Sequence, residues 1–496
     1  MRQYHFSLAA AAGVALAVGS GSAATFNVLN QFEGGIGGYT TPQPAPLFSR
    51  GAPADVSGAV GMNGTSELVT EMLNGYFGVY TSAGVPITQE TGGVFWTNAL
   101  GATAFNAATG GGRISLSSPQ IVYDPTSNRW FASAELSGAS SSFLVAASNT
   151  SDPGGVWSGF SIPSGGGSAA SLYTMAVNGQ NVYLDAPAGG GASFVAIPKA
   201  AMIAATPSVD GYRITSAPST GGYIVQPVQE TGSSSSTEYY YSGDNTNQLN
   251  RTEMTGTSLY NYSLSQGPGS AANFTTASAV STTAAIAQPG TTDTISAGTS
   301  GLSSNLYMVN GLVWGTQVVQ NKAFPTLNSI RYFAINPKTN KLVTQGIISD
   351  TSGHISYTNP SIAVSSSGNV VIDFSGGGAT SNLATYVATG TFNGADLELN
   401  LSAAQVLQAG TGPYKQVSTW SQYSSVVADP TNPNDFWIFQ ELPSGTNATQ
   451  WDTWITQIDP PLLGATVAVP EPGVLPILFL GAAPLLLTLR RRKRFQ

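Results

Sequence analysis

The chain has 496 residues, 25 acidic and 17 basic side chains, a formal net charge of -8 and no cysteine. This length can bury a core without disulfides, and the lack of cysteine excludes thiolate metal sites, thiol nucleophiles and thiol redox chemistry. Charged residues make up only 8% of the chain, against about 25% in typical proteins. So few basic residues argue against a surface that grips nucleic acid phosphates.

The N-terminal residues have the layout of an export signal. Arg2 precedes an apolar run over residues 8–18, and small residues follow over 19–24. A basic residue, a short apolar run and small residues in this order are typical of a secretory signal peptide. We therefore predict a signal peptide over residues 1–24, cleaved at its end, and a short N-terminal segment over residues 25–44.

Short apolar runs between turn residues fill the middle of the chain. The 58 glycines and 29 prolines of the sequence separate runs of about four to eight β-branched or aromatic residues, and few windows show a helical period. This pattern predicts an all-β domain, which we place at residues 45–460, and its size points to a β-propeller or to two sandwiches. The clearest strands are residues 76–80, 142–148, 181–184, 361–364 and 370–374.

Three segments repeat one hairpin pattern, in which a strand is followed by an Asp-Pro or Asn-Pro turn and a returning strand. Asp or Asn before proline starts such a turn through a hydrogen bond from its side chain to the backbone. Recurring hairpins of this kind are typical of propeller blades, so we favour a β-propeller of about seven blades. The three segments are residues 121–131, 332–343 and 425–437.

Residues 150–157 match the pattern Ser/Thr-x-Asp-x-Gly-x-x-Trp, through Thr150, Asp152, Gly154 and Trp157. This motif resembles the Asp-box of sialidase-like propellers. The resemblance implies that Asp152 caps a hairpin turn, that Gly154 takes a positive φ and that Trp157 packs beneath the loop. In that family the Asp-box is structural and lies away from the active site.

The order of segments is similar to that of a family of exported bacterial propeller proteins of mostly unknown function. The similarity covers roughly residues 46–458, with a diverged Ser/Thr-rich stretch over 215–300. It implies a fold and a location, and it implies no reaction. The segments that support it are residues 53–61, 74–80, 123–130, 310–314, 360–364 and 420–424, together with the Asp-box.

Few residues suit metal or nucleophilic chemistry. The sequence has two histidines, and His5 lies in the predicted signal peptide, so only His354 could serve a catalytic triad and no multi-histidine metal site can form. We interpret His354 as a loop residue. A sialidase would need three arginines around a carboxylate, and we assign Arg129 to the hairpin motif instead. The mature chain has six arginines, Arg50, Arg113, Arg129, Arg213, Arg251 and Arg331. A glycosidase that uses two carboxylates stays open, because no spacing singles out a pair.

Two further groups allow a binding interpretation. Asp429, Asn432, Asn434 and Asp435 place four oxygen-bearing side chains within seven residues, which would suit a weakly bound calcium ion. The alternative, which we favour, is an Asx turn between strands. The tryptophans could stack on sugars, but packing in the core is the expectation we prefer. They are Trp96, Trp130, Trp157, Trp314, Trp420, Trp437, Trp451 and Trp454.

The C-terminal residues combine three parts after a predicted linker over residues 461–468. Val469-Pro470-Glu471-Pro472 precedes an uncharged run over residues 473–489, and Arg490-Arg491-Arg492-Lys493-Arg494 follows. The run is near the lower length limit for a transmembrane helix, and basic residues beyond it stay cytoplasmic. This layout resembles the PEP-CTERM sorting signal of Gram-negative bacteria, which an exosortase is thought to recognise and cleave. A plain C-terminal membrane anchor is the alternative.

Together these features predict an exported protein of the cell envelope or extracellular matrix, held at the inner membrane by its C-terminal helix before processing. We expect a structural or carbohydrate-binding propeller, with the exosortase and the secretion machinery as partners and extracellular polysaccharide as a candidate ligand. We assign no catalytic residue, and no cofactor other than the weakly bound calcium ion. The alternative is a secreted glycan-active hydrolase or lyase on a sialidase-like propeller.

Overall fold

The structure is a computed structural model of the whole chain, which divides into the units Met1–Pro461 and Leu462–Gln496. The second unit lies outside the described residues, as do the predicted signal peptide and the sorting signal, which stay predictions. The described residues are 26–37, 54–109, 115–137, 142–163, 174–188, 191–218, 225–231, 235, 237–243, 249–255, 258–262, 284–297, 301–415, 420–443 and 451–460.

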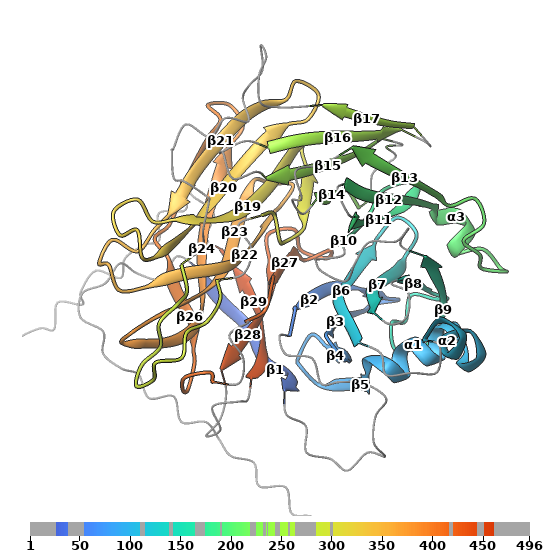
Figure 1. Ribbon diagram of the computed structural model, residues 1–496, viewed down its shortest axis with the longest axis horizontal. Coiled ribbons are helices and arrows are strands. Elements are labelled where there is room, and N and C mark those ends of the chain that lie inside the picture. Colours follow the sequence, from blue (N-terminus) through green and yellow to red (C-terminus); the bar gives the residue numbers. More distant parts are fainter. Residues whose placement is uncertain are drawn as a thin grey trace, which may run out of the picture. The chain divides into compact units, whose positions relative to one another are not determined.

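The first unit is built almost entirely of antiparallel sheets whose strands follow one another along the chain (Figure 1). Sheet 1 contains β2 (Ser57–Asn63), β3 (Ser66–Leu73), β4 (Tyr76–Thr81) and β5 (Pro86–Thr91). Sheet 2 contains β6 (Ser115–Asp124), β7 (Arg129–Ser137), β8 (Ser142–Ser148) and β9 (Trp157–Pro163). Sheet 3 contains β10 (Thr174–Val177), β11 (Asn181–Ala188), β12 (Gly191–Pro198) and β13 (Arg213–Pro218).

The next eight strands form one continuous sheet made of two four-stranded parts. Sheet 4 contains β14 (Val225–Gln229), β15 (Thr237–Gly243), β16 (Leu249–Thr255) and β17 (Ser258–Tyr262). Sheet 5 contains β18 (Leu306–Val309), β19 (Leu312–Gln320), β20 (Asn328–Asn336) and β21 (Lys341–Ile348). A short parallel pairing of β14 with β18 joins the two parts.

The last two sheets complete the unit. Sheet 6 contains β22 (Ser356–Val364), β23 (Asn369–Gly378), β24 (Ser381–Asn393) and β25 (Glu398–Leu401), and β26 (Gln405–Ala409) also pairs with β24. Sheet 7 contains β27 (Ser425–Ala428), β28 (Phe436–Pro443) and β29 (Trp451–Asp459), and its fourth strand is β1 (Asn27–Gly37) from the other end of the unit. The sequence pattern placed residues 25–44 outside the β-domain, and the pairing of β1 with β29 corrects that boundary.

The first strands of the sheets contact one another in order. Strand β2 contacts β6, β6 contacts β10, β10 contacts β14, and β14 pairs with β18. Strand β22 then contacts β18 and β27, and β27 contacts β2 of sheet 1. The side chains of β8, β23 and β28 are buried along their whole length, because neighbouring sheets cover both faces of these strands.

Helices are few in the described part of the chain. The helices α1 (Gly92–Leu100) and α2 (Ala102–Thr109) connect sheet 1 to sheet 2, and α3 (Lys199–Met202) follows β12. The Thr91 hydroxyl accepts a hydrogen bond from the Val94 amide at the start of α1, as N-cap residues do. Among the helices of the described residues, none combines the length and the apolar character needed to cross a bilayer.

The predicted strands agree with the structure. All five runs named in the sequence lie within β4, β8, β11, β22 and β23, so the prediction of a mostly β chain is confirmed. The repeated hairpins divide into two kinds. Residues 121–131 and 425–437 join the first two strands of sheets 2 and 7, whereas residues 332–343 join the last two strands of sheet 5. The helices α1 and α2 were not predicted.

Candidate functional site

The residues of the Asp-box motif form a compact turn between β8 and β9. The Asp152 carboxylate accepts a hydrogen bond from the Gly154 amide (2.9 Å), and the Trp157 indole donates to the Pro153 carbonyl (2.9 Å). Trp157 is 7% exposed and packs edge-on against Phe77 and Phe95. The motif therefore serves to hold the turn against sheet 1 and α1.

Gly154 differs from the expectation in its backbone, because it is not among the residues with positive φ. A Cβ atom at this position would lie 3.0 Å from the Thr88 hydroxyl of β5. The glycine is needed here because sheet 1 approaches closely, and no left-handed conformation is involved.

The candidate calcium residues form an Asx turn. One Asp429 oxygen accepts hydrogen bonds from the Thr431 amide (2.7 Å) and the Asn432 amide (3.1 Å), and the other accepts from the indole of Trp437 (3.0 Å). The side-chain oxygen of Asn434 accepts from Ser367 and Asn369, and Asp435 is 7% exposed. In the described ranges no group of three or more His, Asp or Glu side chains could hold a metal ion.

His354 and the arginine side chains that the structure describes do not converge on a site. His354 lies in an exposed loop, where its backbone amide donates to Asp350 (2.7 Å). Arg129, Arg251 and Arg331 lie in sheets 2, 4 and 5. Burial lowers the pKa of Arg331 to about 10. Arg50 and Arg113 lie outside the described residues, as does the side chain of Arg213.

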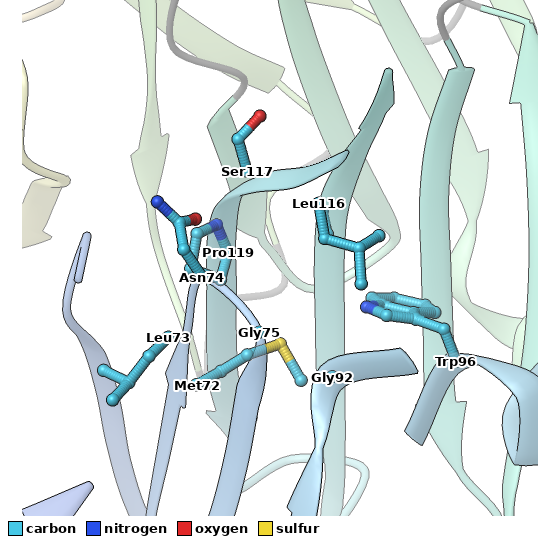
Figure 2. Close-up of a pocket in the computed structure, with 10 residues that line it drawn as sticks. Met72, Leu73, Asn74, Gly75, Gly92, Trp96, Leu116, Ser117 and Pro119 are labelled. Carbon is cyan, nitrogen blue, oxygen red and sulfur yellow. The ribbon is translucent and has the colours of Figure 1, made fainter. Parts of the chain in front are cut away.

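The tryptophans lie mainly in the core, as we preferred. Seven of the eight are buried and Trp454 is half-buried. Figure 2 shows a small pocket where sheet 1, α1 and sheet 2 meet, lined among others by Asn74, Trp96 and Ser117. Its volume is ≈ 10 Å³, which is room for about one water molecule. Neither feature offers a platform or cavity for a sugar ring.

The most unusual polar arrangement lies where sheet 7 meets sheet 1, at a place we call the seam: Asp55, Glu71, Glu441 and the groups that bind them. Glu71 of β3 is completely buried. Its carboxylate accepts hydrogen bonds from the Tyr80 hydroxyl of β4 (2.9 Å), the Thr453 hydroxyl of β29 (2.7 Å) and the Gly35 amide of β1. Burial raises the pKa of Glu71 to about 7, although these three donors oppose the shift.

Asp55 and Glu441 bind backbone amides where the two sheets meet, and Glu441 binds one from each side, Ser421 before β27 and Ala54 before β2. Asp55, just before β2, accepts hydrogen bonds from the Gln422 amide (2.8 Å) and the Asn74 side chain (2.7 Å). Glu441 of β28 accepts from the Ser421 amide (2.9 Å). Burial raises the pKa of Asp55 to about 6, and it raises that of Glu441 well above its usual value, with a further contribution from Asp55.

Tyr423 extends the seam to sheet 2. Its hydroxyl donates to the Pro119 carbonyl of β6 (2.6 Å), and its side chain is 2% exposed. The seam therefore joins sheets 7, 1 and 2 through buried polar contacts. Because its carboxylates are at most 3% exposed, they are hydrogen-bond acceptors within the fold and do not face solvent.

None of the seam carboxylates was predicted as a site residue from the sequence. A signal was present, since Glu71 and Glu441 are the acids within the largely apolar runs 68–73 and 436–442. An acid in a strand buried on both faces must find internal donors. Which donors these are depends on strands that are hundreds of residues away in the sequence.

Comparisons with known proteins add no family. No family model matches the chain, and no curated protein matches it. Among solved structures, an α-L-arabinofuranosidase from Fusarium graminearum is 10% identical over 82% of this chain and 93% of its own, with a TM-score of 0.38. A subtype N10 neuraminidase-like protein of A/little yellow-shouldered bat/Guatemala/060/2010 is 10% identical over 70% of this chain and 95% of its own, with a TM-score of 0.37.

The catalytic domain of a Coprinopsis cinerea α-L-arabinofuranosidase is 12% identical over 69% of this chain and 90% of its own, with a TM-score of 0.31. TM-scores this low support no argument about fold or activity, so the proposals below depend on the sequence and the contacts of this chain.

Proposed function

We propose that this protein is an exported, closed β-propeller of seven blades with a structural or carbohydrate-binding role in the cell envelope or extracellular matrix. The observation that supports it most is the seam, where buried carboxylates join the first and last sheets. The three seam carboxylates are bound to backbone and hydroxyl donors inside the fold, so they do not line a cleft as the acids of a two-carboxylate glycosidase would.

Closure is supported by a repeated contact between the first strands. The Ser57 hydroxyl of sheet 1 accepts a hydrogen bond from the Ile121 amide of sheet 2 (3.0 Å), and Ser361 of sheet 6 accepts from Val426 of sheet 7 (3.1 Å). Ser425 of sheet 7 in turn donates to the Gly58 carbonyl of sheet 1 (3.3 Å). Sheet 7 thus meets sheet 1 through the same kind of contact that joins consecutive sheets, as a closed ring requires.

Export and sorting are supported by the two ends of the sequence. We propose that residues 1–24 are removed on export and that an exosortase cleaves near Pro470 to Pro472. Mass spectrometry of the exported protein should then find a C-terminus close to these prolines. Recovery of intact Arg490 to Gln496 from the mature protein would contradict exosortase processing and favour a plain membrane anchor.

The role itself is tested by incubating the exported protein with polysaccharide from the producing cells and with arabinofuranoside and sialoside substrates. We expect co-sedimentation with the polysaccharide or a loss of matrix integrity on deletion, without release of sugar. A Glu71→Gln variant is the control, because it alters the seam and should leave binding unchanged at a temperature where it is folded. Turnover of a glycoside that disappears in Asp55→Asn or Glu441→Gln would overturn the proposal and favour the hydrolase.

A further inference from the structure

Strand β1 is held in sheet 7 by contacts that include two separate carboxyl groups. On one face it meets Glu71, whose partners come from β1, β4 and β29. On its other face is Glu33, which interacts with Asp452 of the neighbouring strand β29. Pairing of β1 with β29 is irregular between Glu33 and Ile36, but β29 itself pairs regularly with β28. Successive residues of a strand point to opposite faces. Because Thr453 of β29 binds Glu71 and the adjacent Asp452 interacts with Glu33, the two carboxyl groups lie on opposite sides of sheet 7.

The backbone of β1 packs closely against the Glu71 side chain. A Cβ atom at Gly34 would lie 2.4 Å from the Glu71 carboxylate and 2.5 Å from the Thr453 hydroxyl, and one at Gly35 would lie 2.5 Å from Leu73. The two glycines let the backbone of β1 reach Glu71 directly. The Thr453 hydroxyl also lies 3.3 Å from the Gly35 carbonyl and shares its single proton between this carbonyl and Glu71. Strand β1 therefore contacts Glu71 and Thr453 through both a backbone amide and a backbone carbonyl.

Among the described residues, the groups around these carboxyls offer no positive charge to offset ionisation. Strand β4 contributes Tyr76 and Tyr80, whose hydroxyls are 2.8 Å apart. The remaining titratable side chains on strands packed against β1 are acidic: Glu67 of β3, which interacts with Asp429 and Asp435, Glu441 of β28, opposite Thr453, and Asp452 and Asp459 of β29. The ion pairs in the described part of the chain, Lys199–Asp124 and Arg251–Glu253, lie elsewhere.

We propose that protons at Glu71 and at the Glu33–Asp452 pair lock the N-terminal strand β1 into sheet 7, so that the strand is held in acid and released as the pH becomes alkaline. Deprotonation leaves a buried charge under Gly34 and Gly35. On the other face it places two like charges on neighbouring strands, which destabilises their pairing. Both effects favour separation of β1 from β29.

The raised pKa values of these carboxyl groups agree with a strand β1 that is held at acid pH and released at alkaline pH. Burial raises the pKa of Glu71 to about 7, and partial burial together with Asp452 raises that of Glu33 to about 7. Once the strand is released, the pKa of both groups would return to near 4.5. The stabilisation is therefore complete below about pH 4.5 and is lost as the pH rises through about 7.

Hydrogen exchange of the full protein tests whether these protons hold β1 in sheet 7. Exchange of the β1 amides is followed by mass spectrometry at pH 6 and pH 8, and the rates are corrected for intrinsic exchange. For wild type we expect the protection of residues 27–37 to fall about tenfold for each of the two carboxyl groups, since one pKa unit is a factor of ten. Glu71→Gln and Glu33→Gln should each lose about one tenfold step, and the double variant should lose both.

The matched control is Glu135→Gln, which changes a buried glutamate of β7 in sheet 2 and should keep the wild-type pH response of β1. Glu33→Gln changes a side chain on the solvent side, so the test remains even where Glu71→Gln folds poorly. Protection of β1 that is equal at the two pH values would overturn the proposal. So would an equal loss in β7 peptides, because that would be global unfolding.

Discussion

The seam and the interface between sheets 3 and 4 both bury carboxyl groups completely, but the two regions differ in the hydrogen-bond donors that they offer to these groups. Glu71 at the seam has donors from three strands. Asp185 of β11 has no hydrogen-bond partner for either oxygen among the described residues, and neither does the hydroxyl of Tyr240, whose pKa is raised chiefly by burial. The neighbouring Glu238 does accept from the Val228 amide (2.8 Å).

This difference teaches that burial of an acid does not define its role. At the seam the carboxylate is the common acceptor of strands that are far apart in the sequence, so its removal would leave several donors unpaired. At the other interface burial alone raises the pKa of Asp185 well above its usual value. Asp185 pairs with Phe194 of β12, and the Phe194 ring packs edge-on against Tyr240, with the ring centroids 4.7 Å apart.

The largest expected effect is at the seam. Glu71→Leu should lower the free energy of unfolding by about 3–5 kcal/mol, because the Tyr80, Thr453 and Gly35 donors lose their acceptor and each unpaired buried group costs about 1–3 kcal/mol. Urea unfolding followed by tryptophan fluorescence measures the change. A loss below about 1 kcal/mol would show that the three donors find other partners.

The second effect is the pH dependence of the whole fold. Burial raises the pKa of Asp55 to about 6, of Glu71 to about 7 and of Asp373 to about 8. Each group stabilises the fold fully below the pKa that it has in the unfolded chain, and this stabilisation is lost as the pH rises through its pKa in the folded protein. A tenfold difference in proton affinity between the two states corresponds to about 1.4 kcal/mol. The urea midpoint should therefore fall from pH 5 to pH 8.5, and a rise over this range would contradict the assignment.

Adding a methyl group at Gly34 tests how closely β1 packs against sheet 1. Gly34→Ala should cost about 1–3 kcal/mol, as overpacking of a core does, because the new Cβ would lie against Glu71 and Thr453. Gly394→Ala is the matched control, since a Cβ there meets nothing within 4 Å. Thermal unfolding of the two variants should separate them, and equal midpoints would mean that β1 shifts without cost.

The smallest effect, of opposite sign, is expected between sheets 3 and 4. Asp185→Leu should raise the free energy of unfolding by about 1 kcal/mol, because it removes a buried acid that has no partner and fills the space with apolar atoms. Asp185→Asn keeps the polarity and should gain nothing. Destabilisation by Asp185→Leu would instead mean that the carboxyl has a partner, and the contrast with Glu71 would no longer hold.

Much of the fold could be predicted from the sequence, while the site could not. Runs such as residues 142–148 and 370–374 have a composition typical of strands, and Asp124 in its Asp-Pro turn accepts hydrogen bonds from the amides of residues 126 and 127, as local geometry requires. The helix α1 was missed because its apolar face, with Phe95 and Trp96, covers only about two turns. The position of β1 was missed because its partner, β29, begins more than 400 residues later.

The sequence by itself determined what depends on short range. The strands and turns follow from short runs of β-branched and aromatic residues and from Asx and glycine residues between them, and the lack of cysteine makes burial the source of stability. The tertiary structure alone decided which acids are buried with donors and which without, because hydrogen bonds to Glu71 come from residues 36 positions before it and 382 after it. A carboxyl group takes its pKa from the groups that surround it in space, and sequence order does not specify those neighbours.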